Sequence, residues 1–461
     1  MNTVTVVTPT GCIGNRGIDK AAFKSCIQNA RPDVVAVDAG SLDCGPWYLG
    51  SGQAHSPRRN IEWDIDTILT EAVPAGVRVI IGSAGGSGAA EHVRQTVAIV
   101  QRVAAQRKLK FRLAVIWSDV SPQWLASQLT DGVAKHAVHC ATGAALTRED
   151  IESSHAIVGM MGTGPIVDAL KNGAEVIIAG RAVDAAVIAS YPIFRGHDPG
   201  LAYHMGDIME CAESCAEEIA PTLRALGRNR IPIIGRIGNG GFELRPSVDT
   251  LACTPESCLM HSAYERTSFN HIKVPEGTID RSQSLYEAID RNATRISGSR
   301  FVAEPHSILL EGVRQVGYRS IFPIAIRTPA MLRQLDEILS DVDNIEQELF
   351  GSDGRFKIHW HKYGDNAVLQ SAETVSGSHE IGILADVVAD SQDLAHDVAY
   401  DLLTRLGFWR YPGRYTTAGN IAVTLSPGIV DAGEVFEFSI YHALEIADDR
   451  EIFRTEIINV D

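Results

Sequence analysis

Four apolar runs in the first two hundred residues end abruptly in clusters of Gly, Ser, Asp or Arg. Unbroken apolar runs of this kind are typical of parallel strands that helices cover on both faces. In such sheets ligands bind beyond the carboxyl ends of the strands. The polar clusters stand at these ends, so we expect a ligand site there. The runs and their clusters are Val34–Val37 with Asp38–Pro46, Val77–Ile81 with Gly82–Gly88, Leu113–Trp117 with Ser118–Asp119, and Glu175–Ala179 with Gly180–Asp184.

Composition limits the function classes. The 461 residues are enough for two or three domains, and 45 % hydrophobic with 21 % charged residues is ordinary for a globular protein. A net charge of −16 argues against nucleic acid as the main partner, although a local pocket could still bind an anionic metabolite. Eight cysteines form no disulfide framework, no signal peptide precedes Thr3, and no apolar run could span a membrane. We expect a cytoplasmic protein.

Strand and helix patterns alternate up to about residue 235, which indicates βαβ units. The fold expected is therefore α/β, with a mostly parallel sheet flanked by helices. The turn signal Gly238-Asn239-Gly240-Gly241 and the alternating runs beyond it, such as Phe356–His361, indicate a second, α+β domain. We divide the chain into an α/β ligand-binding domain, residues 1–235, and an α+β domain, residues 236–461, that supplies an assembly surface.

The segment Gly82–Gly88 contains only Gly, Ser and Ala and lies between a strand and a helix. Glycines allow backbone N–H groups to approach an anion, and the start of a helix adds partial positive charge. Ser83, Gly85 and Gly86 are therefore candidate substrate-binding residues. The alternative is a tight turn that needs glycine only for its backbone angles.

A second glycine-rich segment, Gly11–Gly17, follows the first expected strand. Its spacing is GxxGxxG and not the GxGxxG of dinucleotide-binding folds, so no nicotinamide cofactor is expected. A nicotinamide oxidoreductase stays as the weakest alternative. No Gly-x-Ser-x-Gly, Walker A or HExxH motif occurs, which removes the usual support for common hydrolases, kinases and zinc proteases.

Five ionisable residues stand nearest the expected strand ends: Asp38, Asp43, Asp119, Arg181 and Asp184. Carboxylates at such positions act as general bases or bind a divalent cation, and an arginine can hold a substrate carboxylate with two hydrogen bonds. The alternative is that they cap helices or neutralise one another. The cofactor is unknown, and a divalent cation is left open.

Further candidates are polar residues in glycine-flanked segments. Ser41 follows Asp38, and His204 follows a turn at Pro199-Gly200, so both are assigned to substrate binding. His359 and His361 would share one face of a strand, but no third zinc ligand is identifiable by spacing.

The segment Val37–Gly50 resembles the pattern Asp-Ala-Gly-Ser-Thr-Asp-x-Gly-Pro-Tyr-Tyr-Leu-Gly of the acyclic terpene utilization (AtuA) family, with Leu42 in place of Thr and Trp47 in place of Tyr. The segments Ile80–Gly86, Gly180–Asp184, Asp198–Gly200 and Tyr411–Arg414 are similar to later signatures of the family. The resemblance implies a role in the catabolism of branched acids and their coenzyme A thioesters. It also implies a small companion protein as a partner.

These observations favour a lyase, of the hydratase type, that acts on a small carboxylic acid or its CoA thioester. Asp38 or Asp43 would be the base, Arg181 the anchor for a substrate carboxylate, and Ser83–Gly86 the cradle for the developing oxyanion. The alternative is a non-catalytic subunit that binds a ligand or partner. The expected partners are a small anionic metabolite, further copies of the chain and a small second subunit, with no nucleic acid and no membrane.

Overall fold

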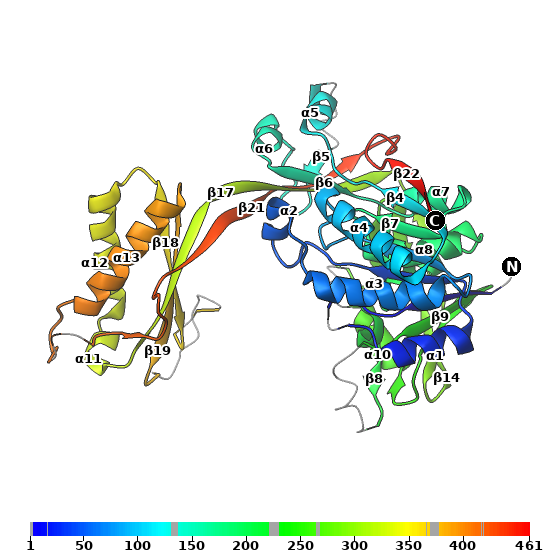
Figure 1. The fold of residues 1–461 in the computed structure, drawn as a ribbon, viewed down its shortest axis with the longest axis horizontal. Coiled ribbons are helices and arrows are strands. Elements are labelled where there is room, and N and C mark those ends of the chain that lie inside the picture. Colours follow the sequence, from blue (N-terminus) through cyan, green and yellow to red (C-terminus); the bar gives the residue numbers. More distant parts are fainter. Residues whose placement is uncertain are drawn as a thin grey trace. The chain divides into compact units, whose positions relative to one another are not determined.

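The computed structural model describes residues 3–15, 17–130, 137–220, 230–263, 268–365, 367–368, 378–415, 417 and 419–461. The chain folds into two compact units (Figure 1). Unit 1 comprises Met1–Arg314 and Phe438–Asp461, and unit 2 comprises Gln315–Glu437.

The centre of the unit 1 sheet is parallel. Its strands lie in the order β1, β2, β3, β7, β4, and each is parallel to its neighbours. These are the apolar runs that the sequence predicts as strands, and polar clusters follow their carboxyl ends. The strands are β1 (Val4–Thr8), β2 (Val34–Asp38), β3 (Arg78–Gly82), β7 (Val176–Ala179) and β4 (Phe111–Ile116).

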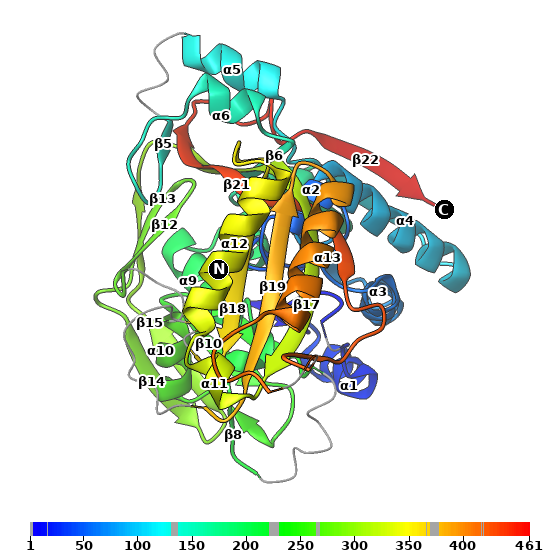
Figure 2. The same ribbon diagram turned by 90° about the vertical axis from the view of Figure 1, so that its left-hand side faces the viewer.

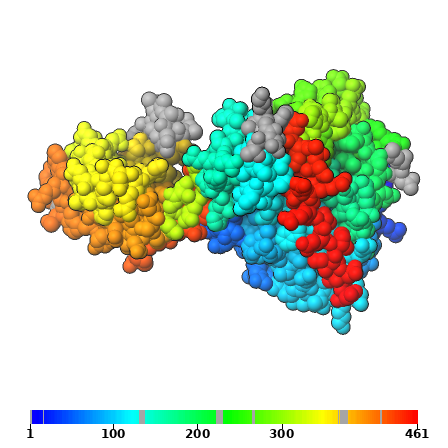
Figure 3. All heavy atoms as spheres, turned by 90° about the horizontal axis from the view of Figure 1, so that it is seen from above, coloured from blue at the N-terminus to red at the C-terminus, as the bar shows by residue number. Residues whose placement is uncertain are grey.

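Antiparallel strands extend this sheet at both edges, so the prediction of a mostly parallel sheet is wrong. On one side β9 (Ile233–Gly238) pairs with β1 and turns back through Asn239-Gly240 into β10 (Gly241–Pro246). Gly240 adopts a φ of +81°, which suits a tight hairpin. Beyond β10 lie β15 (Ala293–Ser297) and β14 (Leu285–Asp290). The opposite edge is β22 (Thr455–Val460), which pairs with β4 and lies on the surface as the red end of the chain in Figure 3.

Helices cover both faces of the parallel strands because neighbouring residues in each strand point to opposite sides. In β1, for example, Val6 packs into one core cluster and Val7 into the other. The helices that contribute to the cluster of Val7 are α1 (Lys20–Ala30), α3 (Arg58–Ala72) and α4 (Ala90–Arg107). Those that contribute to the cluster of Val6 are α7 (Gly164–Lys171), α8 (Asp184–Phe194) and α9 (Pro199–Met209).

The remaining elements of unit 1 are short. The helices are α2 (Trp47–Ser51), α5 (Pro122–Thr130), α6 (Arg148–Glu152), α10 (Pro255–Ser262) and the 3₁₀ helix η2 (Ala212–Cys215). The strands are β5 (Ala137–His139), β6 (Ala156–Met160), β8 (Glu217–Glu218), β11 (Leu251–Ala252), β12 (His271–Val274), β13 (Gly277–Asp280) and β16 (Arg300–Ala303). In the described part of the chain, none of the helices has the length and apolar character that a membrane crossing requires.

Unit 2 is a small α+β structure. The chain enters it within β17 (Ser307–Ile326) and leaves it within β21 (Val430–Glu445). In between, β18 (Phe356–Tyr363) and β19 (Ile381–Ala389) form an antiparallel sheet with β17. The helices α12 (Leu335–Phe350) and α13 (Gln392–Phe408) lie over one face of this sheet (Figure 2). The shorter elements are α11 (Pro329–Leu332) and β20 (Ala422–Val423).

The expected domain boundary near residue 235 falls inside unit 1. The change in sequence texture at that point marks the start of the β9–β10 hairpin and not a new compact unit. Because β9 pairs with β1, the hairpin joins the first sheet and its residues pack into the same core.

Candidate functional site

A cavity of about 660 Å³ lies at the carboxyl ends of β2 and β7, where the sequence predicts the ligand site. All the residues that line it belong to unit 1. We call it the strand-end cavity. It is lined by Ser41, Leu42, Asp43, His139, Met160, Arg181, Val183, Asp184, Glu210, Leu309, Glu311, Phe438 and Tyr441.

The loop after β2 forms part of the rim of this cavity. Both Ser41 and Asp43, which the sequence analysis assigns to the site, line the cavity. The Ser41 hydroxyl donates a hydrogen bond of 2.6 Å to Oδ2 of Asp43, and it accepts one from the Asp43 backbone N–H. Asp43 is exposed. Its carboxylate is therefore positioned by its own loop and remains accessible to a ligand.

Arg181 lines the cavity but is held by partners within the chain. Its Nε lies 2.8 Å from Oε2 of Glu311, and its Nη1 lies 3.5 Å from Oδ1 of Asp184 and 3.3 Å from the Ser83 hydroxyl. Burial alone would lower the pKa of Arg181, but the carboxylates of Glu311 and Asp184 outweigh it and raise that pKa. The guanidinium is thus a buried charge that carboxylates of the protein itself hold in place. To anchor a substrate carboxylate, it would have to exchange one of these partners.

Asp38 lies behind the cavity and does not line it. Its side chain is buried, and its Oδ2 accepts a hydrogen bond of 2.9 Å from the backbone N–H of Gly40. Its Oδ1 has no hydrogen-bond partner in the described part of the chain. Burial and the nearby charge of Asp184 raise the pKa of Asp38 well above its ordinary value, against the opposing effect of Arg181. This environment favours the protonated form of the carboxyl group.

The glycine-rich segment after β3 is packed against the chain itself. The backbone N–H groups of Ser83, Ala84, Gly86 and Gly88 all donate to carbonyl groups within the protein. A Cβ atom at Gly85 would lie 2.7 Å from Cβ of His92, and one at Gly86 would lie 2.9 Å from Cβ of His55. The glycines therefore allow close packing, as in the alternative reading of this segment as a tight turn. Neither glycine lines the strand-end cavity.

A carboxylate of the protein occupies the helix N-terminus that follows this segment. The first N–H group of α4, at Ala90, donates a hydrogen bond of 3.0 Å to Oδ1 of Asp119. Asp119 follows β4, and burial raises its pKa. An incoming anion would have to displace it, so the structure gives Asp119 the capping role that the sequence analysis held as the alternative.

The first glycine-rich segment shows the same arrangement. The backbone N–H groups of Gly14 and Ile18 donate to the two oxygens of Asp64, at 2.7 and 2.8 Å. Burial raises the pKa of Asp64 to about 6, against the effect of the two amides. Arg16 lies outside the described residues.

His204 is not part of the strand-end cavity. It is buried in α9, where Nδ1 lies 2.6 Å from the Ser299 hydroxyl and Nε2 lies 3.0 Å from the Tyr286 hydroxyl. Burial lowers its pKa to about 3. Both ring nitrogens therefore have hydroxyl partners within the protein.

Several residues that line the cavity carried no signal in the sequence analysis. His139, Glu210 and Tyr441 come from β5, the end of α9 and β21, which are far apart along the chain. Glu311 did carry a signal that could have been used. It stands in the apolar run Ile308–Val313, where a charge is costly unless it has a partner.

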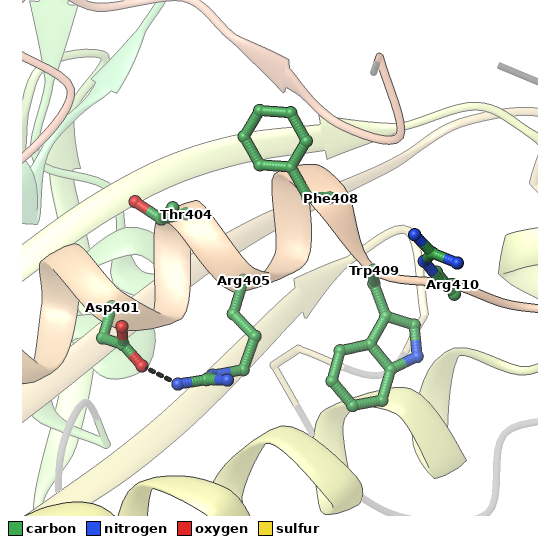
Figure 4. Close-up of a pocket in the computed structure, with 6 residues that line it drawn as sticks. All are labelled: Asp401, Thr404, Arg405, Phe408, Trp409 and Arg410. Atoms are coloured by element: carbon green, nitrogen blue, oxygen red, sulfur yellow. Dashed lines mark hydrogen bonds and ion pairs between the residues drawn. The ribbon is translucent and has the colours of Figure 1, made fainter. Parts of the chain in front are cut away.

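Two other cavities contain none of the predicted site residues. One, of about 840 Å³ in unit 1, is lined mainly by residues near the start of α7 and by residues 447–456. The other, of about 450 Å³ in unit 2, lies at the end of α13 (Figure 4). Its lining residues are Asp401, Thr404, Arg405, Phe408, Trp409 and Arg410, and Asp401 pairs with Arg405. The strand-end cavity is therefore the candidate site.

Comparison with known proteins identifies the family. The model of the family described as acyclic terpene utilisation family protein AtuA matches residues 10–424. No curated protein and no solved structure gives a significant match. The family match covers most of unit 1 and nearly all of unit 2, including both rims of the strand-end cavity that follow β2 and β7. The chain therefore belongs to the AtuA family.

Proposed function

We propose that this chain is a catabolic lyase of the hydratase type, acting on a small acyl thioester or carboxylic acid in the strand-end cavity. The observation that carries the proposal is the accessible carboxylate of Asp43 at a cavity that also contains the buried ion pair of Arg181 and Glu311. A carboxylate at the rim can take or give a proton, while buried charges behind it keep the electrostatic environment fixed.

Of the two aspartates that the sequence proposes as the base, Asp43 is the better candidate. Asp43 lines the cavity, whereas Asp38 is buried and lies behind it. In this scheme Asp43 removes a proton from the carbon beside the substrate carbonyl. Asp38, Asp184 and Arg181 then form a positioning network, in which the protonation of Asp38 sets the charge beneath the cavity.

The charge of the cavity favours the thioester over the free acid. Four carboxylates line the cavity, those of Asp43, Asp184, Glu210 and Glu311, and Arg181 supplies the only guanidinium among the lining residues. A free carboxylate would be repelled at short range, because like charges in a partly dry site interact strongly. The acyl group of a thioester is neutral and avoids this cost.

The divalent cation that the sequence analysis left open is not part of this proposal. Within the described residues, no group of three or more His, Cys, Asp or Glu side chains is arranged to hold a metal ion. The proposed reaction uses side chains of the cavity, with Asp43 as the proton acceptor.

The proposal is tested with purified protein and a panel of small saturated and unsaturated acyl thioesters. Addition or loss of water is followed together with exchange of the proton beside the carbonyl in D₂O. Asp43→Asn should lower both rates by about two to four decades, the usual contribution of general acid–base catalysis. The fold should persist, because Asp43 is exposed.

Asp168→Asn is the matched control for this experiment. Asp168 is an exposed aspartate of unit 1 that pairs with Lys171 and does not line the strand-end cavity. Its replacement should leave both rates unchanged. Equal rates in the wild-type protein and Asp43→Asn would remove Asp43 as the base, and a strict requirement for nicotinamide would overturn the reaction class.

The second candidate function is that of a non-catalytic subunit. It is favoured by the internal partners of Arg181 and of the glycine-rich segment, which leave few free groups for chemistry. In that case the purified chain would show no exchange alone and would act only with a small second subunit. Measuring the exchange with and without the small companion protein separates the two functions. Light scattering of the same samples tests for the expected homo-oligomer.

A further inference from the structure

A thiol from the loop after β2 and an imidazole from the segment between α2 and α3 are in direct contact. Sγ of Cys44 lies 2.9 Å from Nε2 of His55. Cys44 directly follows Asp43 in the chain, and its side chain is exposed. A cysteine paired with a histidine at this distance is the arrangement used for nucleophilic attack by sulfur.

The glycine-rich segment after β3 positions the imidazole. The backbone N–H of His55 donates a hydrogen bond of 2.9 Å to the carbonyl oxygen of Gly85. The missing side chain of Gly86 leaves room for Cβ of His55, as the 2.9 Å separation from a Cβ built there shows. The ring of Tyr48 packs edge-on against the imidazole, with centroids 5.1 Å apart. The histidine is therefore fixed by neighbours on several sides before any ligand arrives.

The protonation states of Cys44 and His55 determine which of the two donates the hydrogen bond. Partial burial and the charge of Asp43 raise the pKa of Cys44 above its ordinary value, so the sulfur keeps its proton near neutral pH. The thiol can then donate to Nε2 in the tautomer that carries the ring hydrogen on Nδ1. Such a pair reacts by general-base assistance, because the imidazole takes the proton as the sulfur attacks. It differs from a preformed thiolate, the form that peroxide-sensing cysteines use.

We propose that Cys44 is a nucleophile for acyl thioesters, with His55 as its general base. The sulfur of Cys44 attacks the acyl carbonyl, and its proton passes to Nε2 of His55. The new bond joins the acyl carbon to the sulfur of Cys44, the bond from that carbon to the departing sulfur breaks, and His55 returns the proton to the departing thiol. The step exchanges one thioester for another, so it needs no oxidant and no further reactant.

This step is independent of the proton transfer proposed for Asp43. It needs only the pair of Cys44 and His55, and it leaves a covalent product that can be observed without turnover. Asp43→Asn tests the first proposal, whereas labelling of Cys44 tests the second, so the failure of one does not imply the failure of the other.

The experiment treats the full chain with the small thioester S-acetyl-N-acetylcysteamine and locates the acetyl mass on each cysteine by peptide mass spectrometry. Cys140 is the internal reference, because it is an exposed thiol of unit 1 with no imidazole hydrogen bond to its sulfur among the described residues. Acetylation of Cys44 should exceed that of Cys140 by about a hundredfold, the lower range of general-base effects.

Substitution of the histidine completes the test. In His55→Asn, acetylation of Cys44 should fall to the rate of Cys140, while the rate of Cys140 is unchanged and reports an intact fold. His55→Gln serves if the first variant does not fold, and Cys44→Ser should carry no acetyl group in this peptide. Equal labelling of Cys44 and Cys140 in the wild-type protein, or labelling of Cys44 that does not respond to His55, overturns the proposal.

Discussion

Two loops at the same edge of the unit 1 sheet differ in what their polar groups contact. The segment Gly82–Gly88 after β3 has the composition of an anion cradle, yet its N–H groups bond to the chain and Asp119 caps the helix behind it. The loop Ser41–Cys44 after β2 has no glycine, yet Ser41, Leu42 and Asp43 line a cavity, and the side chains of Asp43 and Cys44 are exposed. Glycine content thus reports how closely a loop is packed, and exposed side chains report where a ligand can bind.

The largest expected effect comes from adding one methyl group to the segment Gly82–Gly88. A Cβ at Gly88 would overlap the backbone nitrogen of Arg181, and Gly88 has a φ of +67°. Gly88→Ala should therefore destabilise the protein by roughly 3–5 kcal/mol, as backbone strain and overpacking combine. Urea unfolding of the full chain measures this value.

Gly45→Ala is the matched variant in the chain that follows β2. Gly45 also has a positive φ, +98°, but no atom lies within 4 Å of a Cβ built there. Its replacement should cost only about 1 kcal/mol, the strain of the backbone conformation alone. Similar losses in the two variants would show that the two loops are packed alike and would remove the distinction.

A second expected effect concerns the carboxylate inside the first glycine-rich segment. Burial raises the pKa of Asp64 from an ordinary value of 3.8 to about 6. An acid whose pKa is raised by folding stabilises the folded state below the unfolded pKa, and this contribution is lost as the pH rises through the folded pKa. The stability of the wild-type protein relative to Asp64→Asn should therefore fall by up to about 3 kcal/mol between roughly pH 4 and pH 7. A constant difference across this range would show that Asp64 titrates normally.

The smallest expected effect concerns Asp119, which caps the helix α4 that follows the segment Gly82–Gly88. Asp119→Ala removes the acceptor for the N–H of Ala90 and should cost about 1 kcal/mol, whereas Asp119→Asn keeps an oxygen there and should cost less. The alanine variant also opens the helix N-terminus. Inorganic phosphate should then raise its melting temperature but not that of the wild-type protein, because a ligand stabilises only a state that binds it. Equal responses to phosphate would show that Asp119 does not occupy an anion site.

The sequence predicts much of the parallel core because its signals are local. The apolar runs that the sequence predicts as strands are β2, β3, β4 and β7. The antiparallel edges were missed because pairing of β9 with β1 depends on contacts between residues more than two hundred positions apart. Local sequence patterns do not show which distant strands pair with one another.

The same distinction applies to the candidate site. Ser41, Asp43, Arg181 and Asp184 follow strands directly, so the strand-end rule places them at one cavity, and all four line it. Gly85, Gly86 and His204 fit a ligand site equally well by composition, but they do not line this cavity and pack against His92, His55 and Ser299. The partner that fixes Arg181, Glu311, lies 130 residues away in the chain.

The two strands that connect the units also build one wall of the cavity. Leu309 and Glu311 lie on β17, Phe438 and Tyr441 lie on β21, and both strands continue without interruption into unit 2. Glu311, the buried partner of Arg181, therefore stands on the same strand that carries the chain into unit 2. The wall of the cavity is in this way made from strands that run on into a part of the chain that contributes none of its lining residues.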